Sequence, residues 1–366
     1  MQVYLDNNTT TMVDPQVKEA MEPFFSELYG DPNALHHNAS ELKQPLQDAM
    51  ERIYATLNAS HDDSVVITSG ASESNNWVVM STYFEQILSG EKNHILLSEV
   101  ESPSIIKAAK FLESKGARIT LLPVNSEGII QAHTLKDFIT PKTALVSINW
   151  VNGESGAIFP IEHIAYFCEQ KGVPFHTDAT HAMGKIPMSL KDNAIDYLSF
   201  DAHLFHGPKG IGGLYMRKGK ELNPMLHGSN EMDGLRAGML NVPAIVGMGK
   251  AMELAFDAMD FELEDAKELL EEFEEALLEI EGVKILSPNN KRVANTLWVS
   301  FDGIDSEALL WDLSQAGIAA SKGSSDASSI IFALSRFSTQ EEMEYTLEEV
   351  KKGVVRLRAI SGTYAK

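Results

Sequence analysis

Three short segments of the chain combine polar and small residues in patterns suited to binding a small molecule. The first, Thr68–Asn76 (TSGASESNN), joins the end of an apolar strand pattern to the start of a helix pattern through small residues. Unpaired N–H groups and the positive end of the helix dipole at such a turn bind phosphate. A plain turn between a strand and a helix has the same pattern, so this segment alone leaves both interpretations open.

The second and third segments place carboxylates and imidazoles after apolar strands. In His176–His181 (HTDATH) a strand pattern ends at Asp178, whose carboxylate can hold a protonated ring nitrogen or simply cap a loop. In Ser199–Gly213 (SFDAHLFHGPKGIGG) the Gly/Pro-rich end needs unusual backbone angles. The histidines there and beyond do not have the spacing of a metal-ligand set, so we expect core or hydrogen-bonded side chains: His203, His206 and His227.

The elements that position these segments alternate between strand and helix patterns from about residue 60 to 215. Helix patterns at Ser72–Leu88 and Ile161–Lys171 lie between short apolar runs. This alternation predicts a mostly parallel sheet covered by helices, with ligands bound at the carboxyl ends of the strands. The predicted strands are Ser64–Thr68, His94–Leu97, Arg118–Pro123, Ala144–Asn149, Pro174–Asp178, Tyr197–Phe200 and Gly213–Met216.

A long acidic helix is predicted to open a second, smaller unit. Residues 257–281 contain 12 Asp or Glu and one Lys, and apolar residues recur every three or four positions from Phe256 to Ile280. This acidic face is either simply solvated or a docking surface for a basic partner. Strands at Val283–Leu286 and Thr296–Ser300, a helix at Ser306–Gln315 and a last helix from Gln340 complete the unit. We therefore divide the chain into an arm (1–15), a large α/β domain (16–250) and the acidic helix with a small α+β domain (251–366).

The composition excludes several classes of protein. Of the 366 residues, 44% are hydrophobic and 22% charged, as in ordinary globular proteins. The net charge of −22 repels phosphate backbones and anionic lipids, so we expect no nucleic acid and no membrane among the partners. The sequence has no long apolar run, no basic start typical of a secretory signal and one cysteine, Cys168, so we expect a cytoplasmic protein without disulfides.

Seven segments, in order and spacing, resemble the cysteine desulfurases of the class V aminotransferase family, which have the type I pyridoxal-phosphate fold. The segments are YLDNNTTT, TSGASESNN, NGESG, HTDATH, SFDAHLFHGPKGIGGLY, RAGMLNVPAIVGMGKA and FALSRFSTQEE. The resemblance implies a large domain around a mainly parallel seven-stranded sheet, a small C-terminal α+β domain, and a homodimer with sites near its interface.

The resemblance also shows departures on the cofactor side. It places the Schiff-base lysine of the family at Leu204, the phosphate-binding serine at Asp201 and the histidine that stacks on the ring at Ser102. Other cofactor-binding positions of the family hold Gly153, His181 and Met239. What persists is a vestigial cofactor pocket predicted at Ala71, Ser72, Asp178, His181, Asp201 and His203.

The substrate side departs as well. The nucleophilic cysteine of the family aligns with Asp326, in a loop (322–329) that is shorter here than in the family. The arginine that binds the substrate carboxylate aligns with Ile331, whereas Arg336 matches another family arginine and is expected to support the structure. Cys168 lies in a predicted helix and is expected to be structural.

With these departures, the sequence predicts a degenerate family member with no intact catalytic residue. We expect pyridoxal phosphate to be absent or bound without a covalent link, and no metal site. The predicted function is a non-catalytic scaffold or regulatory partner in sulfur or iron–sulfur metabolism. We expect a homodimer or a heterodimer with an active paralogue, and a sulfur-acceptor or cluster-scaffold protein as partner. The alternatives are a pyridoxal-phosphate enzyme with an altered active site and an ordinary cysteine desulfurase.

Overall fold

The computed structural model describes residues 1–288, 291–324 and 327–361, apart from the side chains of 260–263. The chain divides into two compact units, a large unit (Met12–Trp150 and Phe159–Asp257) and a small unit (Met1–Thr11, Val151–Ile158 and Ala258–Lys366). This division differs from the predicted ranges 1–15, 16–250 and 251–366, because two short segments pair with distant parts of the small unit. Val3 pairs with Ile318, and Ala157 forms a bridge with Arg292.

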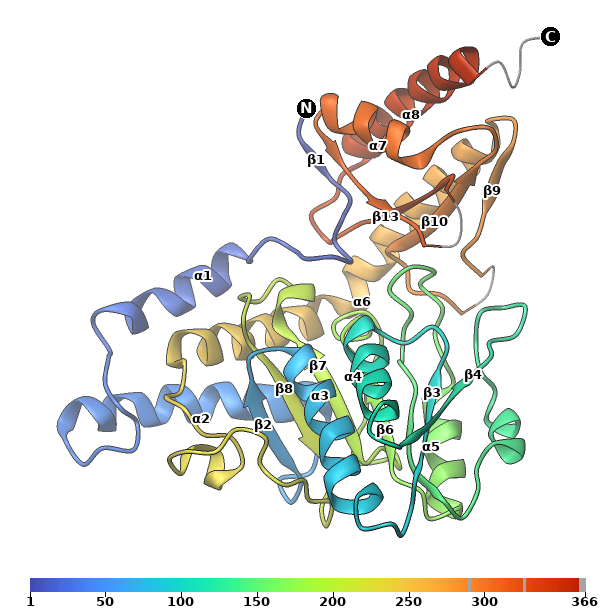
Figure 1. Ribbon diagram of the computed structural model, residues 1–366. Coiled ribbons are helices and arrows are strands. Elements are labelled where there is room, and N and C mark those ends of the chain that lie inside the picture. Colours follow the sequence, from blue (N-terminus) through green and yellow to red (C-terminus); the bar gives the residue numbers. More distant parts are fainter. Residues whose placement is uncertain (289–290, 325–326, 362–366) are drawn as a thin grey trace. The chain divides into compact units, whose positions relative to one another are not determined.

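A seven-stranded sheet forms the centre of the large unit (Figure 1). The order is β2-β8-β7-β6-β5-β3-β4; β8 is antiparallel to both of its neighbours, and all other pairs are parallel. The sheet and each predicted strand are confirmed to within two residues. The strands are β2 (Ser64–Thr68), β3 (His94–Ser98), β4 (Arg118–Leu122), β5 (Thr143–Ser147), β6 (Phe175–Asp178), β7 (Tyr197–Asp201) and β8 (Gly212–Met216).

Helices pack against this sheet through apolar side chains. All residues of β3 and β5 are buried, as expected for central strands of a parallel sheet. Trp77 of α3 and Ile105 of α4 share one core cluster with Ile95 and Leu97 of β3. The helices are α1 (Pro15–Met21), α2 (His37–Leu57), α3 (Ala71–Thr82) followed by a π-helical turn (Tyr83–Ile87), α4 (Pro103–Glu113) and α5 (Ile161–Gln170), with short helical turns at Glu22–Phe25, Ala132–Asp137, Ala202–Leu204 and Glu231–Gly234.

The small unit contains a four-stranded antiparallel sheet of order β12-β13-β10-β9 and a parallel pair, β1 with β11. The predicted strands and both helices are found. The central strand β13, whose five residues are all buried, was not predicted. The elements are β1 (Val3–Tyr4), β9 (Val283–Ile285), β10 (Thr296–Phe301), α7 (Ser306–Gln315), β11 (Ile318–Ala319), β12 (Ser321–Lys322), β13 (Ser329–Ala333) and α8 (Gln340–Ser361).

The predicted acidic helix is the C-terminal part of α6 (Val242–Leu278), which is 37 residues long. The prediction missed its start, where Asn241 Oδ1 accepts a hydrogen bond from the backbone N–H of Ala244 (3.3 Å) and caps the helix. Leu270, Phe273 and Leu277 lie in the small unit's core. Most of the acidic side chains between them are exposed, which confirms an amphipathic helix.

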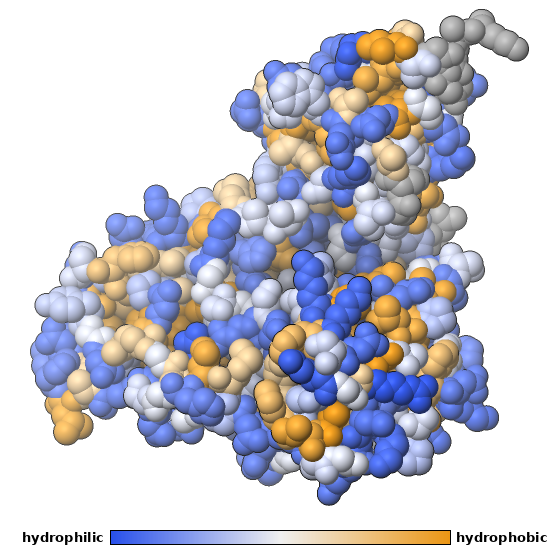
Figure 2. Space-filling view, viewed as in Figure 1, coloured by the Kyte–Doolittle hydropathy of each residue, from blue (hydrophilic) through white to orange (hydrophobic). Residues whose placement is uncertain are grey.

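The surface carries both hydrophilic and hydrophobic residues. Figure 2 shows a face on which hydrophilic residues predominate, with separate hydrophobic patches between them. Among the described residues, no helix is both long enough and apolar enough to cross a membrane.

Candidate functional site

The predicted pocket residues of the large unit gather at the carboxyl ends of β6 and β7 and at the turn that begins α3. Asp178 ends β6 and Asp201 ends the neighbouring β7. Contacts join them to α3: Asn75 Nδ2 donates to Asp178 Oδ2 (2.8 Å) and the backbone N–H of Ala71 donates to Asp201 Oδ2 (2.9 Å). These contacts bring residues far apart in the sequence together, although Ser72 itself is exposed to solvent.

Asp201 lies against the first turn of α3. Its Oδ2 is so close to this turn that a Cβ added to Gly70 would lie 2.6 Å from it. His203 Nε2 lies 3.6 Å from its other carboxylate oxygen. Burial raises the pKa of Asp201, and the nearby His203 imidazole and the Ala71 N–H group partly offset that rise. The amide at the positive end of α3, which is where an anion binds, is thus already hydrogen-bonded to a carboxylate of the same chain.

Asp178 is held by neutral donors. It is 5% exposed, and its Oδ1 accepts a hydrogen bond from the backbone N–H of Thr180 (2.9 Å). Its Oδ2 accepts the hydrogen bond from Asn75 Nδ2. Asn75 Nδ2 also lies 3.0 Å from Ser104 Oγ and 3.4 Å from Ser102 Oγ. Ser102 is therefore part of a small hydroxyl and amide network.

Sequence reasoning missed Asn75 and two further polar residues of this site, Glu101 and Asn149. The spacing from Ala71 to Asn75 puts both on one helix face, which is a usable signal, but nothing in the sequence pairs α3 with β6. Glu101 is 8% exposed and Asn149 5% exposed. Burial first, and then the charge of Asp178, raises the pKa of Glu101 well above its usual range; the backbone N–H groups of Asn149 and Ser102 offset this only in part.

Two buried imidazoles near the carboxylates, those of His176 and His181, are neutral at pH 7. His176 is fully buried between Ser147 Oγ (2.8 Å from Nδ1) and Ser199 Oγ (2.9 Å from Nε2), and burial lowers its pKa to about 4. Burial and the charge of Lys185 lower the pKa of His181 to about 4, against the opposing effect of Asp178. Burial also lowers the pKa of Lys185 to about 8. His176 and His181 therefore add no positive charge to the site at neutral pH.

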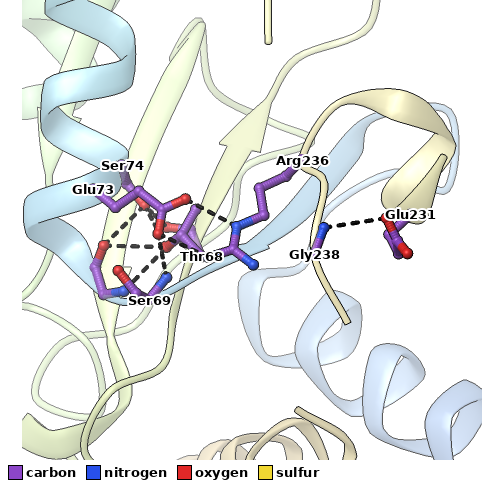
Figure 3. A network of polar contacts seen from close by, with 9 residues as sticks. Thr68, Ser69, Glu73, Ser74, Glu231, Arg236 and Gly238 are labelled. Atoms are coloured by element: carbon purple, nitrogen blue, oxygen red, sulfur yellow. Dashed lines mark hydrogen bonds and ion pairs between the residues drawn. The ribbon is translucent and has the colours of Figure 1, made fainter. Parts of the chain in front are cut away.

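A second network fixes the turn before α3 (Figure 3). Glu73 accepts hydrogen bonds from Arg236 Nε (3.0 Å) and Nη2 (3.2 Å) and from the backbone N–H of Ser69 (2.7 Å). In the same loop as Arg236, Glu231 Oε2 accepts from the backbone N–H of Gly238 (3.1 Å). Burial alone would raise the pKa of Glu73, but these hydrogen bonds hold the pKa below its usual range. The Arg236 guanidinium is thus paired within the fold.

Two further predicted residues of the large unit, Leu204 and Cys168, are buried. Leu204 is 4% exposed in the helical turn after β7. Cys168 is fully buried in α5, and burial, followed by the charge of Asp196, raises the pKa of its thiol to about 12. Lys209 is exposed, as is Met239 (60%).

In the small unit, Ile331 of β13 is 5% exposed and pairs across the sheet with Trp298 and Ser321. The backbone N–H (3.3 Å) and hydroxyl (2.6 Å) of Ser324 both donate to Glu154 Oε2. The carbonyl of Gly153 accepts a hydrogen bond from Asn8 Nδ2 (2.8 Å). Asp326 lies outside the described residues.

The described residues also include no group of three or more His, Cys, Asp and Glu side chains placed to hold a metal ion.

Nearly the full length of the chain matches known proteins in sequence and in fold. The aminotransferase class-V family matches residues 3–346, and "Cysteine desulfurase IscS" of Dictyoglomus turgidum is 36% identical over 382 residues, covering 98% of this chain and 96% of that protein. The chain belongs to the cysteine desulfurase family. "Cysteine desulfurase NifS" of Azotobacter vinelandii is 35% identical over 382 residues, covering 98% of this chain and 94% of its own.

Solved structures of the family superpose on this chain. A NifS-like protein has a TM-score of 0.93 at 34% identity, covering 98% of this chain and 100% of the other. The cysteine desulfurase CsdA from Escherichia coli has a TM-score of 0.86 at 22% identity, covering 97% and 95%. The predicted resemblance and the predicted type I fold are confirmed. The family uses pyridoxal phosphate.

Proposed function

We propose that this chain is a non-catalytic member of the cysteine desulfurase family that acts as a scaffold or regulatory partner in sulfur or iron–sulfur metabolism. The observation that carries the proposal is the hydrogen bond from the Ala71 N–H to Asp201 Oδ2 at 2.9 Å. A cofactor phosphate bound at the start of α3 needs that amide, and a carboxylate there repels a phosphate dianion.

The other residues at the cofactor positions do not fit pyridoxal phosphate either. Leu204 is buried and its alkyl side chain has no amine, so it cannot form a Schiff base with the cofactor. Ser102 has no ring to stack on the cofactor, and its hydroxyl lies in the network around Asn75. Arg236, the arginine beside the α3 turn, is paired with Glu73. We therefore derive no reaction step through this cofactor.

The substrate positions support the same proposal. Transfer of sulfur to a family enzyme needs a thiolate, and the only cysteine of the sequence is Cys168, whose thiol is buried and whose pKa is raised to about 12. The family's substrate-binding arginine is replaced by Ile331, which is packed between strands of the small unit. Catalytic residues that act as a unit depend on one another, so losing one already removes most of the activity. Restoring a single residue is therefore not expected to restore turnover.

Sulfide release from cysteine tests the proposal. The purified chain, supplied with cysteine, pyridoxal phosphate and a thiol reductant, is expected to release no more sulfide than the same mixture without protein. A purified relative with cysteine desulfurase activity is the positive control. Sulfide that increases in proportion to the amount of this chain would contradict the proposal.

An enzyme with an altered active site is the second candidate. Asp178 favours it, because this carboxylate is retained at the end of β6 with both oxygens hydrogen-bonded. Such an enzyme would hold the cofactor without a covalent link or with a completing partner. Equilibrium dialysis separates the two: we expect no saturable uptake of pyridoxal phosphate, whereas saturable uptake that is lost in Asp178→Ala would favour the enzyme.

We also propose that the chain dimerises, with itself or with an active paralogue, and contacts a sulfur-acceptor or cluster-scaffold protein. Large apolar side chains of the large unit are exposed, among them Phe25 (66%), Tyr29 (62%) and Leu35 (105%). Exposed apolar surface of this kind is typical of interaction sites. Light scattering that shows only a particle of 40.3 kDa at micromolar concentration would exclude the homodimer.

A further inference from the structure

Helix α4 presents a basic and aromatic side to solvent, in a chain whose net charge is −22. Residues 103–118 contain three Lys, one Arg and one acidic residue, Glu113, so this segment has a net charge of +3. Lys110 and Phe111 follow Lys107 by three and four positions, so the three lie on one side of the helix, and all are exposed. The other side, which includes Ile105, packs in the core of the large unit.

Aromatic side chains extend this surface onto the π-helical turn that follows α3. The Tyr83 hydroxyl donates a hydrogen bond to the backbone carbonyl of Lys115 (3.0 Å), just beyond the end of α4. The Tyr83 and Phe84 rings are in edge contact, and Lys115 Nζ lies 5.4 Å from the centre of the Phe111 ring. Phe84 is 60% exposed and Phe111 51%. We call this surface the basic face; its residues are Tyr83, Phe84, Lys107, Lys110, Phe111, Lys115 and Arg118.

The charges of the basic face are not neutralised within the fold. Among the described residues, Lys107, Lys110 and Arg118 form no ion pair. Other exposed lysines do pair, as Lys218 does with Asp62 (2.8 Å). The positive charge of the basic face is therefore available to another molecule.

The C-terminal half of α6 carries the complementary charge. Exposed acidic side chains recur there every three or four positions, on the side of the helix opposite to the small unit's core; this acidic stripe consists of Glu264, Glu268, Glu271, Glu275 and Glu279. Within the part of the chain that the structure describes, Glu264, Glu268 and Glu275 form no ion pair. Leu278, on the same side of the helix, is 51% exposed.

We propose that the acidic stripe of one copy docks on the basic face of a second copy, in a head-to-tail contact. The charges of the two surfaces are complementary, and Leu278 supplies an apolar side chain to contact Phe84 and Phe111. Because the two surfaces are different, the contact does not close on itself as a two-fold dimer does, and copies can be added repeatedly. The inference goes beyond the proposed function, and it requires neither catalysis nor the homodimer.

The net charge of the chain opposes this association. Two copies with a net charge of −22 repel each other over long distances. At about 0.15 M salt the Debye length is about 8 Å, so repulsion between distant charges is largely screened while charges in contact still interact. The experiment therefore needs a control variant that changes the net charge without touching either surface.

Charge reversal on each surface, followed by mixing, tests the proposal. One variant carries Lys107→Glu with Lys110→Glu, and the other carries Glu268→Lys with Glu275→Lys. Sedimentation velocity at increasing protein concentration, in about 0.15 M salt, measures the association of each protein. We expect the wild type to form species larger than a dimer that grow with concentration. Each variant alone is expected to associate about tenfold more weakly, because like charges then face each other.

An equal mixture of the two variants is expected to regain the wild-type association. The two reversed surfaces are complementary to each other, and the two native surfaces remain so. This recovery would also show that the substitutions leave both variants folded.

The matched control is Lys136→Glu with Lys171→Glu, at exposed positions outside the basic face. It changes the net charge as the first variant does, and it should associate as the wild type does. Four results would overturn the proposal: a wild type with no species larger than a dimer, a control that associates as weakly as the first variant, an effect of only one of the two reversed surfaces, or a mixture that associates no better than either variant alone.

Discussion

Replacing Asp201 by serine should open the start of α3 to phosphate. The substitution removes the hydrogen bond from Ala71 N–H and the carboxylate that repels anions. Loss of a side-chain hydrogen bond at a helix start costs about 1 kcal/mol of stability. Because the amide and the positive end of the helix dipole are then available, inorganic phosphate should stabilise the variant. With a Kd of about 1 mM, 10 mM phosphate adds about 1.4 kcal/mol to the free energy of unfolding.

Urea unfolding with and without 10 mM phosphate, at constant ionic strength set by chloride, measures both effects. In the absence of phosphate the variant should be less stable than the wild type; in its presence the variant should regain that loss, while the wild type is unchanged. Asp137→Ser, at an exposed position in the large unit, is the matched control and should respond as the wild type does. Equal stabilisation of wild type and Asp201→Ser by phosphate, or none in either, would refute the reasoning about Asp201.

Three further predictions concern catalysis, partner binding and pH. Leu204→Lys alone should release no sulfide from cysteine, because it restores neither the thiol nor the substrate arginine; turnover by this variant would show that the other departures matter little. Glu268→Lys with Glu275→Lys, both exposed on α6, should weaken capture of a partner in pull-downs from native lysate, whereas Asp178→Ala should not. Lowering the pH from 6.5 to 4 should destabilise the fold, because His176 is neutral in the fold with a pKa of about 4 and takes up a proton on unfolding; His176→Gln should reduce that pH dependence in urea titrations.

The large sheet was predictable because its strands are short apolar runs between turn residues, and all seven were found. The pairing between segments that are distant in the sequence was not predictable. Nothing in the sequence near Val3 indicates a partner at Ile318, so the small unit's share of the N-terminus was missed. The acidic helix was recognised from its period, but its start at Val242 depends on a cap from Asn241.

The site was predicted in part for the same reason. Residue types at family positions were enough to place Asp178 and Asp201 in one pocket and to expect a clash between Asp201 and a phosphate. That Asp201 hydrogen-bonds the very amide a phosphate would use is a matter of geometry, which no spacing reveals. Glu101 was not predicted as a site residue, and the structure buries it to 8% exposure although glutamates are mostly exposed in folded proteins.

The mass of the intact protein after borohydride reduction tests the central claim most directly. The chain is produced in cells supplied with pyridoxine, reduced so that any cofactor attached to a lysine becomes permanent, and measured by mass spectrometry together with its visible absorbance. We predict the unmodified mass of a 40.3 kDa chain and no visible absorbance band that borohydride removes. A borohydride-sensitive band with one added cofactor mass on a single lysine would contradict the account.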